Sequence, residues 1–144
     1  MTIPDVNLLL YAQFADSAQH ASARAWWEAT LSGLEPVGLP WSVLHAFVRL
    51  ATNSRIMHPA LEPSHALEMV ASWLQRSNVM TLVPGPRHWP LFQQMMREGQ
   101  CRGPLSTDAS LAALALEHGA EFCTTDRDFS RFPGLRWRNP LLPS

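Results

Sequence analysis

The chain has few of the residues that mark secreted, zinc-binding or membrane-spanning proteins. Cys101 and Cys123 are the only cysteines in 144 residues, too few and too isolated for a disulfide scaffold or a zinc site. No apolar run approaches the roughly 18 residues that a membrane-spanning helix needs. The chain carries an acid at Asp5 and no cationic leader, so we expect no signal peptide, no membrane partner and a cytoplasmic location.

Lysine is absent, and all 11 basic residues are arginine. The planar guanidinium group of arginine suits phosphate recognition, although biased codon usage accounts for the same composition. The formal net charge is -1, so a polyanionic partner would have to be held by a local basic patch. The first expected strand is not followed by a glycine-rich turn, which excludes a dinucleotide-binding site of the usual kind.

Length and composition predict one domain that spans residues 1–144. Domains cluster near roughly 100–150 residues, and a chain in which 47% of residues are hydrophobic and 16% are charged favours a packed core over disorder. Strands are expected from residue 2 to the acid at 5 and at 36–40, 79–83, 121–125 and 135–138. Helices are expected at 20–31, 40–50, 64–76, 88–97 and 107–118, the last with Ser106 as N-cap, and a helical turn at 128–132. This alternation predicts an α/β fold with a mostly parallel sheet covered on both faces.

Asp5 and Asn7 stand two positions apart in the otherwise apolar stretch 2–12. On an extended chain, side chains two positions apart project to the same side. At the end of a parallel strand they would face the edge where open α/β sheets bind ligands. The alternative is that Asp5 caps the helix that follows. For this stretch alone, both interpretations stay open.

Two further acids fall at comparable topological positions. Asp108 lies in the first turn of an expected helix, and Asp126 directly follows an expected strand, with Asp128 two residues beyond it. If the strands are parallel neighbours, these carboxylates gather at one edge, where they repel one another unless a cation lies between them. Mg²⁺ or Mn²⁺ prefers such oxygen ligands and can promote hydrolysis at phosphorus. The alternative is that each acid only caps a helix or forms a turn.

These segments together resemble the PIN-domain nucleases, and within them the VapC-type toxins of bacterial toxin–antitoxin pairs. The resemblance covers essentially the whole chain and rests on the order and spacing of its pieces. The matching stretches are PDVNLLLYA at 4–12, LPWSVLHAFVR at 39–49, STDA at 106–109 with its helix, TDRDF at 125–129 and FPGLRW at 132–137.

The resemblance implies a three-layer α/β/α fold and an endoribonuclease that depends on Mg²⁺, with Mn²⁺ as a possible substitute. It implies cleavage of structured RNA, either tRNA or ribosomal RNA, and thereby arrest of translation. Asp5 and Asp108 match the principal metal ligands of the family, Asp126 its final acidic position and Asn7 an amide beside the first acid. A small VapB-like antitoxin and a homodimer are implied as well. Thr107 and Asp128, which adjoin these acids, are expected to support the site.

The chain departs from the family pattern at two positions. Ala46 stands where the family usually has a glutamate, so one carboxylate of the usual site is missing, and Val6 replaces a hydroxyl residue. Arg49, three residues after Ala46, shares its helix face and is expected to contact the scissile phosphate or a site carboxylate; the alternative is an ordinary salt bridge. The missing glutamate leaves a second function open, namely a PIN-fold module that binds RNA or antitoxin without efficient cleavage.

Two groups of large side chains are candidates for binding surfaces. Arginines can neutralise phosphates, and exposed aromatic rings can stack on unpaired bases. Beyond the third acid, we expect RNA binding by Arg127, Arg131, Arg136 and Arg138, and burial of the interleaved Phe129, Phe132 and Trp137. We expect core positions for Trp26, Trp27, Trp41 and Phe47, with an antitoxin groove for an apolar helix as the alternative.

Overall fold

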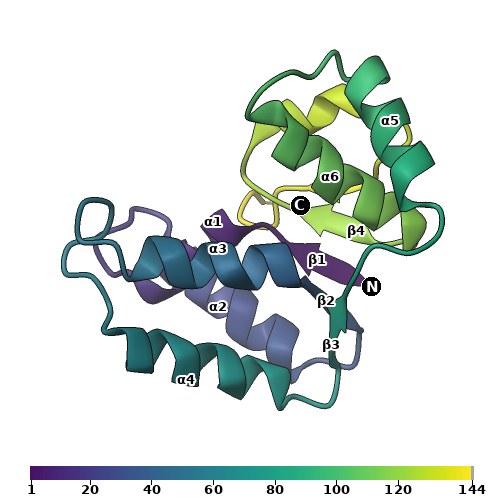
Figure 1. The fold of residues 1–144 in the computed structure, drawn as a ribbon. Coiled ribbons are helices and arrows are strands. Elements are labelled where there is room, and N and C mark those ends of the chain that lie inside the picture. Colours follow the sequence, from purple (N-terminus) through teal and green to yellow (C-terminus); the bar gives the residue numbers. More distant parts are fainter. Residues whose placement is uncertain (144) are drawn as a thin grey trace.

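Five short parallel strands form the centre of the molecule, in the order β3-β2-β1-β4-β5 (Figure 1). The computed structural model describes residues 1–143. The strands are β1 (Thr2–Pro4), β2 (Val37–Pro40), β3 (Val79–Leu82), β4 (Glu121–Cys123) and β5 (Trp137–Arg138). Every pairing between them is parallel, which confirms the predicted α/β fold.

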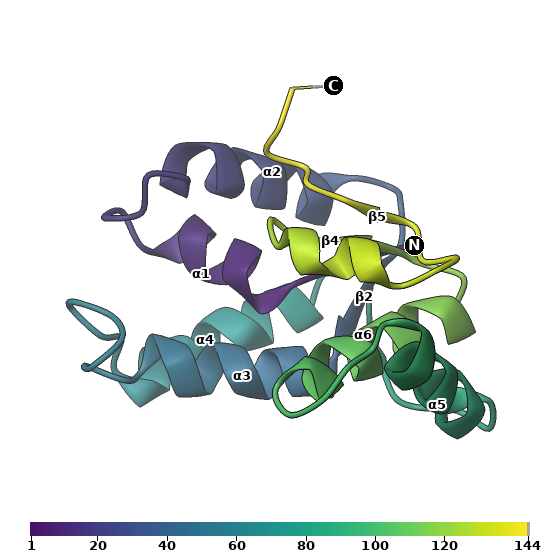
Figure 2. The same cartoon turned by 90° about the horizontal axis from the view of Figure 1, so that it is seen from above.

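Helices lie on both sides of this sheet, with α1 and α2 on one side and α5 and α6 on the other (Figure 2). The helices are α1 (Val6–Gln13), α2 (His20–Ser32), α3 (Trp41–Ala51), α4 (Pro63–Leu74), α5 (His88–Glu98) and α6 (Leu105–Glu117), with a 3₁₀ helix η1 (Arg127–Arg131). The third helix, α3, packs against α1 and β2, and α5 packs along α6. Within residues 1–143, no helix has both the length and the apolar character needed to cross a membrane.

The central strands are buried along their whole length, as parallel strands covered on both faces usually are. In β1, Thr2 is aligned with Val37 of β2 and Pro4 with Cys123 of β4. Parallel pairing in this register brings the carboxyl ends of β1 and β4 to the same edge. The residues that follow these strands, Asp5 and Thr124, therefore meet there.

Aromatic side chains fill the core between the helices. Trp73 of α4 meets Trp27 of α2 edge-on, with ring centroids 5.6 Å apart, and meets Phe47 of α3 at 4.9 Å. Trp27 and Phe47 are buried, which confirms their predicted core positions and excludes them from an antitoxin groove. Trp41, by contrast, is 43% exposed at the start of α3, so its predicted core position is wrong.

Phe129 and Phe132 are buried beside Phe122 of β4, as predicted. Trp137 and Trp26 are only partly buried, and both pack against the core.

The structure differs from the prediction in the stretch after Asp5 and at the start of α6. Strand β1 ends at Pro4 and α1 begins at Val6, so Asn7 lies in a helix and not beside Asp5 on an extended chain. The carboxylate of Asp5 caps α1, and the leucine run that follows favours a helix once it is capped. Likewise, α6 begins at Leu105 because Pro104 already has helical backbone angles, so Ser106 is not its N-cap.

Candidate active site

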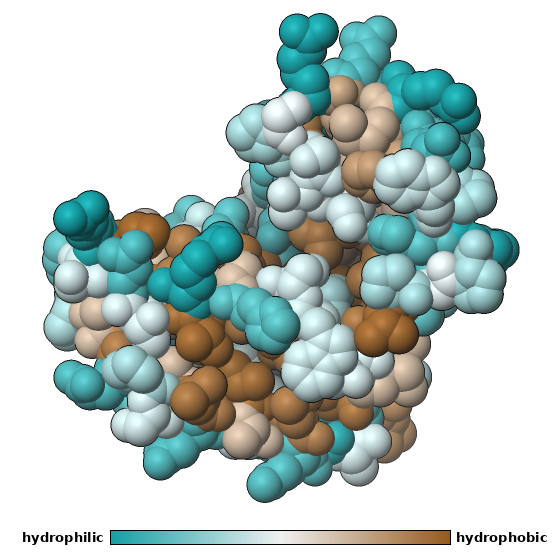
Figure 3. Space-filling model, in the orientation of Figure 1, coloured by the Kyte–Doolittle hydropathy of each residue, from teal (hydrophilic) through white to brown (hydrophobic). Residues whose placement is uncertain are grey.

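Asp5, Asp108 and Asp126 line one cavity of about 220 Å³, although they come from three distant parts of the chain. The surface is hollowed between the part of the molecule that carries α3 and α4 and the part that carries α5 and α6 (Figure 3). The acids reach the cavity from the end of β1, the first turn of α6 and the segment after β4. We call the cavity that these three acids line the acidic cavity. Its other lining residues are Val6, Asn7, Ser42, Val43, Ala46, Arg49, Leu50, Thr107 and Leu111.

Asp5 is the most firmly held of the three acids and is only 7% exposed. Its Oδ1 accepts a hydrogen bond of 2.8 Å from the backbone N–H of Val6, which caps α1. Its Oδ2 accepts a hydrogen bond of 2.6 Å from the hydroxyl of Thr124. The backbone N–H of Asp5 also donates to the carbonyl of Cys123, which extends the pairing of β1 with β4. Asp5 is therefore both a helix cap and a lining residue of the cavity.

Thr124 connects the first acid to the third. Its side chain is fully buried, and its hydroxyl donates to Asp5 while accepting a 3.0 Å hydrogen bond from the backbone N–H of Asp126. Asp126 in turn accepts from the backbone N–H of Asp128 and caps η1. One hydroxyl thus sets the positions of two carboxylates at the sheet edge.

Burial and repulsion from neighbouring acids disfavour ionisation of Asp5 and of Asp108. For Asp5, burial raises the pKa, the hydrogen bonds from Thr124 and Val6 oppose this, and the charge of Asp126 adds to the rise. For Asp108, burial first and then the charges of Asp126, Asp5 and Asp128 together raise the pKa from its ordinary value of 3.8 to about 6, against the opposing charge of Arg131. A cation in the cavity would remove this electrostatic cost.

The donor set of the acidic cavity fits a hydrated hard cation better than a closed protein cage. Within the described part of the chain, no three His, Cys, Asp or Glu side chains form a group that could hold a metal ion by themselves. Mg²⁺ usually keeps several waters and binds through one or two carboxylates. Asp5 and Asp108, with Asp126 on the same cavity wall, satisfy that requirement.

Ala46 and Arg49 both line the acidic cavity from α3. The position where the family pattern has a glutamate thus faces the carboxylates, but alanine contributes no oxygen there. Among residues 1–143, Arg49 forms no salt bridge within 4.0 Å, so the structure contains neither the predicted pair with a site carboxylate nor the ordinary ion pair that was the alternative. Its guanidinium group therefore has N–H donors available for an anionic ligand.

Other residues expected in the site take different positions. Asn7 and Thr107 line the acidic cavity, whereas Asp128 is exposed and acts on it through its backbone bond to Asp126 and its charge. Sequence reasoning missed Thr124 and Ser42. The available signal for Thr124 was a hydroxyl residue at the carboxyl end of a buried strand.

Three of the four arginines that were expected to bind RNA donate hydrogen bonds within the fold. Arg131 donates to the carbonyl of Gly99, and Arg136 to the carbonyl of Gly119. Arg138 pairs with Glu121 at 3.0 Å. RNA binding by Arg127, Arg131, Arg136 and Arg138 stays a prediction.

Comparison with known proteins places the chain among PIN domains. The model of the PIN domain family matches residues 2–135. The chain is 40% identical to ribonuclease VapC33 of Mycobacterium tuberculosis, covering 98% of this chain and 99% of the relative. It is 43% identical to the VapC ribonuclease Mb2897 of Mycobacterium bovis, covering 98% and 96%.

Solved structures of proteins with low sequence identity to this chain have the same fold. A toxin–antitoxin complex from Klebsiella pneumoniae contains a chain that matches with a TM-score of 0.65 and 17% identity, covering 97% of this chain and 98% of that one. The M. tuberculosis VapC20 structure, described as a toxin that cleaves the sarcin–ricin loop, matches with a TM-score of 0.64 and 21% identity, covering 94% and 99%. At these identities, the likeness establishes the fold alone.

Replacing Asp108 tests the cost of a carboxylate that is partly buried and lies near other acids. Because the folded state raises the pKa of Asp108, it binds more protons than the unfolded state between pH 3.8 and about 6, so stability is lost as pH rises through this window. Without divalent metal at pH 7.5, Asp108→Asn should therefore increase the free energy of unfolding by about 1–2 kcal/mol, a few degrees in Tm. Thermal unfolding should show the gain vanish near pH 3.5, while the exposed-site control Asp16→Asn changes little at either pH. An increase in the free energy of unfolding that is equal at pH 7.5 and at pH 3.5 would contradict a raised pKa of Asp108.

Replacing Thr124 tests the bridge between two acids. Thr124→Val keeps the shape but removes the donor to Asp5 and the acceptor for Asp126, so we expect a loss of about 1–3 kcal/mol in the free energy of unfolding. Chemical denaturation measures this loss, with Thr125→Val as the matched control one residue along the chain. An equal effect of the two variants would show that the bridge has no special role.

Proposed function

The chain belongs to the PIN-domain family and to its VapC group, and from this we propose that it is a metal-dependent endoribonuclease toxin controlled by a small antitoxin. The observation that carries the proposal is the convergence of Asp5, Asp108 and Asp126 on one cavity, with the pKa of Asp108 raised by burial and by the neighbouring acids. The names of the close relatives, which are ribonucleases, support the reaction class.

In the proposed reaction, Asp5 and Asp108, with Asp126, hold Mg²⁺ or Mn²⁺. When bound, such an ion activates a water and stabilises negative charge at phosphorus. Thr124 and the N–H of Val6 hold the carboxylate of Asp5 in place before substrate arrives.

Across the acidic cavity, Arg49 provides charged donors for the oxygens of the scissile phosphate. Hydrolysis leaves a 5′-phosphate and a 3′-hydroxyl.

The substrate in this proposal is a structured RNA, either tRNA or ribosomal RNA, and its cleavage in the cytoplasm inhibits translation. The description of VapC20 as a toxin that cleaves the sarcin–ricin loop supports this class of substrate. The Klebsiella toxin–antitoxin complex supports a VapB-like partner. We also propose a homodimer as the functional unit.

A second candidate function is a PIN-fold module that binds RNA or antitoxin without efficient cleavage. The observation that favours it is Ala46, which lines the acidic cavity where a further carboxylate would stand. The two functions differ in whether RNA is cut when metal is supplied.

Incubation with total RNA separates these functions. In Mg²⁺ or Mn²⁺, we expect the wild-type protein to cut RNA, and the Asp5→Asn, Asp108→Asn double variant to lose at least about 100-fold in rate because metal and water positioning are lost. Excess chelator should abolish wild-type cleavage, and Glu68→Gln on the exposed face of α4 should leave it unchanged. Cleavage that is equal in wild type and double variant, or absent from both, would falsify the nuclease proposal.

A further inference from the structure

A second cavity, about 460 Å³ in volume, adjoins the acidic cavity and has no role in the mechanism above. It lies between the start of α3, the first turns of α5 and the first turns of α6. The two cavities share Ser42 and Thr107, so an occupant of one would be next to an occupant of the other. Its full lining is Ser42, His88, Trp89, Phe92, Ser106, Thr107 and Ser110. We call it the aromatic cavity.

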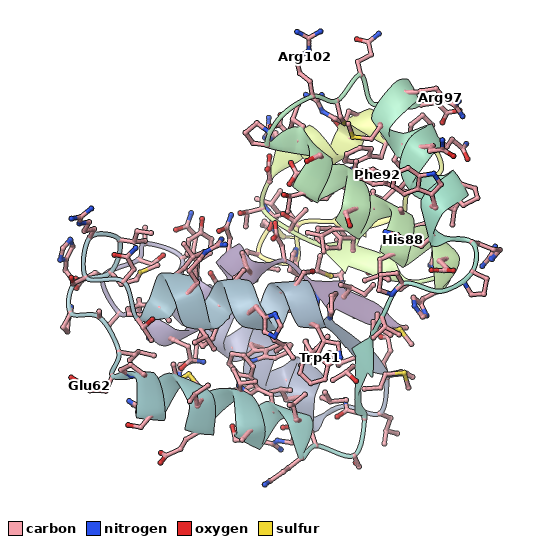
Figure 4. All side chains as sticks on the ribbon, in the orientation of Figure 1. Trp41, Glu62, His88, Phe92, Arg97 and Arg102 are labelled. Atoms are coloured by element: carbon pink, nitrogen blue, oxygen red, sulfur yellow. The ribbon has the colours of Figure 1, made fainter. Side chains whose placement is uncertain are left out.

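One wall of the aromatic cavity consists of aromatic side chains from α5. Trp89 is 64% exposed, unusually high for so large an apolar side chain, and its ring centroid lies 5.5 Å from that of Phe92. The rings of His88 and Phe92 are nearly parallel, at 17°, with centroids 6.3 Å apart. Figure 4 shows His88 and Phe92 on α5, which packs beside α6, and Trp41 at the start of α3.

The facing wall is polar but carries no full charge. Ser106 and Ser110 are four residues apart on α6 and so share a face, with Thr107 beside them and Ser42 contributed by α3. Nδ1 of His88 is buried and has no hydrogen-bond partner among the described residues. An occupant that reached this nitrogen after a small ring rotation would satisfy it. The cavity therefore presents aromatic faces and neutral hydrogen-bonding groups.

The side chains that line the aromatic cavity favour some classes of ligand over others. No arginine, aspartate or glutamate lines the aromatic cavity, so it offers a phosphate no charged partner. An apolar partner helix would meet hydroxyls along one wall, where it needs a hydrophobic groove. A nucleobase has the flat face that stacks on aromatic rings and the polar edge that hydroxyls can bind.

We propose that the aromatic cavity binds one unpaired base of the RNA, next to the phosphate held in the acidic cavity, with Trp89 as its stacking platform. The inference rests on the proposed ribonuclease function, because it uses that function to say which polymer enters. It adds a subsite that selects single-stranded RNA at the cut and that positions the backbone across the acids.

Binding of short RNAs tests the subsite without cleavage. The Asp108→Asn protein, in chelator, is titrated with fluorescein-labelled hexanucleotides of A, C, G or U and with a hexamer of abasic ribose phosphates. Because one base stacked on an aromatic ring contributes about 1–3 kcal/mol, the best hexanucleotide should bind at least roughly fivefold more tightly than the abasic chain. Adding Trp89→Ala should bring the ratio of these two affinities, best hexanucleotide to abasic chain, close to one. Ser110→Leu, which fills the cavity, should do the same.

The matched control is Trp41→Ala, which removes another exposed tryptophan that does not line the aromatic cavity. It should keep the wild-type ratio, and circular dichroism should show all variants folded. The subsite is wrong if the affinity ratio is already near one in the protein that keeps Trp89. It is also wrong if the ratio is unchanged in both Trp89→Ala and Ser110→Leu. A loss of antitoxin binding in Trp89→Ala with RNA binding intact overturns the subsite as well, since the cavity would then belong to a protein partner.

The two proposals fail in different ways. If the unmodified protein cuts total RNA with metal but shows no base-dependent binding, only the subsite is wrong. If it binds bases through Trp89 but cuts no RNA, the subsite stands and the nuclease function is wrong.

Discussion

Parallel pairing of β1 with β4 is the constraint from which the rest of the site follows. Because Pro4 is in register with Cys123, the next residues along the two strands arrive together at the sheet edge. The hydroxyl of Thr124 then donates a hydrogen bond to Asp5 and accepts one from the backbone N–H of Asp126. A shift of one residue in this register would move both groups to the wrong faces of the sheet and dismantle the site.

The site has an electrostatic cost that its proposed function would relieve. Burial raises the pKa of the Asp108 carboxyl and the neighbouring acids add to the rise, so that it reaches about 6. The fold tolerates the cost because the aromatic core around Trp73 and the buried strands stabilise it elsewhere. A hydrated cation between the acids would turn the repulsion into attraction, which is why metal binding and fold stability should be coupled.

Much of the fold could be predicted from the sequence because the apolar segments alternate so regularly. The five strands and most of the helices lie within a few residues of their predicted positions. The exception is the opening stretch, where Asp5 caps a helix that begins at Val6, so the carboxylate has both of the roles that had been treated as alternatives. Oδ1 accepts the capping hydrogen bond from Val6, and Oδ2 accepts the hydrogen bond from Thr124. Asp5 can therefore cap α1 and line the acidic cavity at the same time.

The site could be predicted where its residues are charged or, like Asn7 and Thr107, stand close to an acid in the sequence. Carboxylates at the ends of strands give a signal in the sequence, but Thr124 and Ser42 are ordinary hydroxyl residues until tertiary packing brings them to the cavity. The aromatic cavity was not predictable either. Its rings come from α5 and its hydroxyls from α6 and the start of α3, and which side chains meet depends on how these helices pack.

The most direct test of the central claim is a titration of the side-chain carboxyl of Asp108 by carbon-detected NMR, with and without Mg²⁺. Without Mg²⁺ we expect a pKa of about 6, because burial and the neighbouring acids disfavour the charged form. Saturating Mg²⁺ should lower this pKa well below its metal-free value, since the cation stabilises the carboxylate. A metal-free pKa close to 3.8 that Mg²⁺ leaves unchanged would contradict both the repulsive cluster and its role as a metal site.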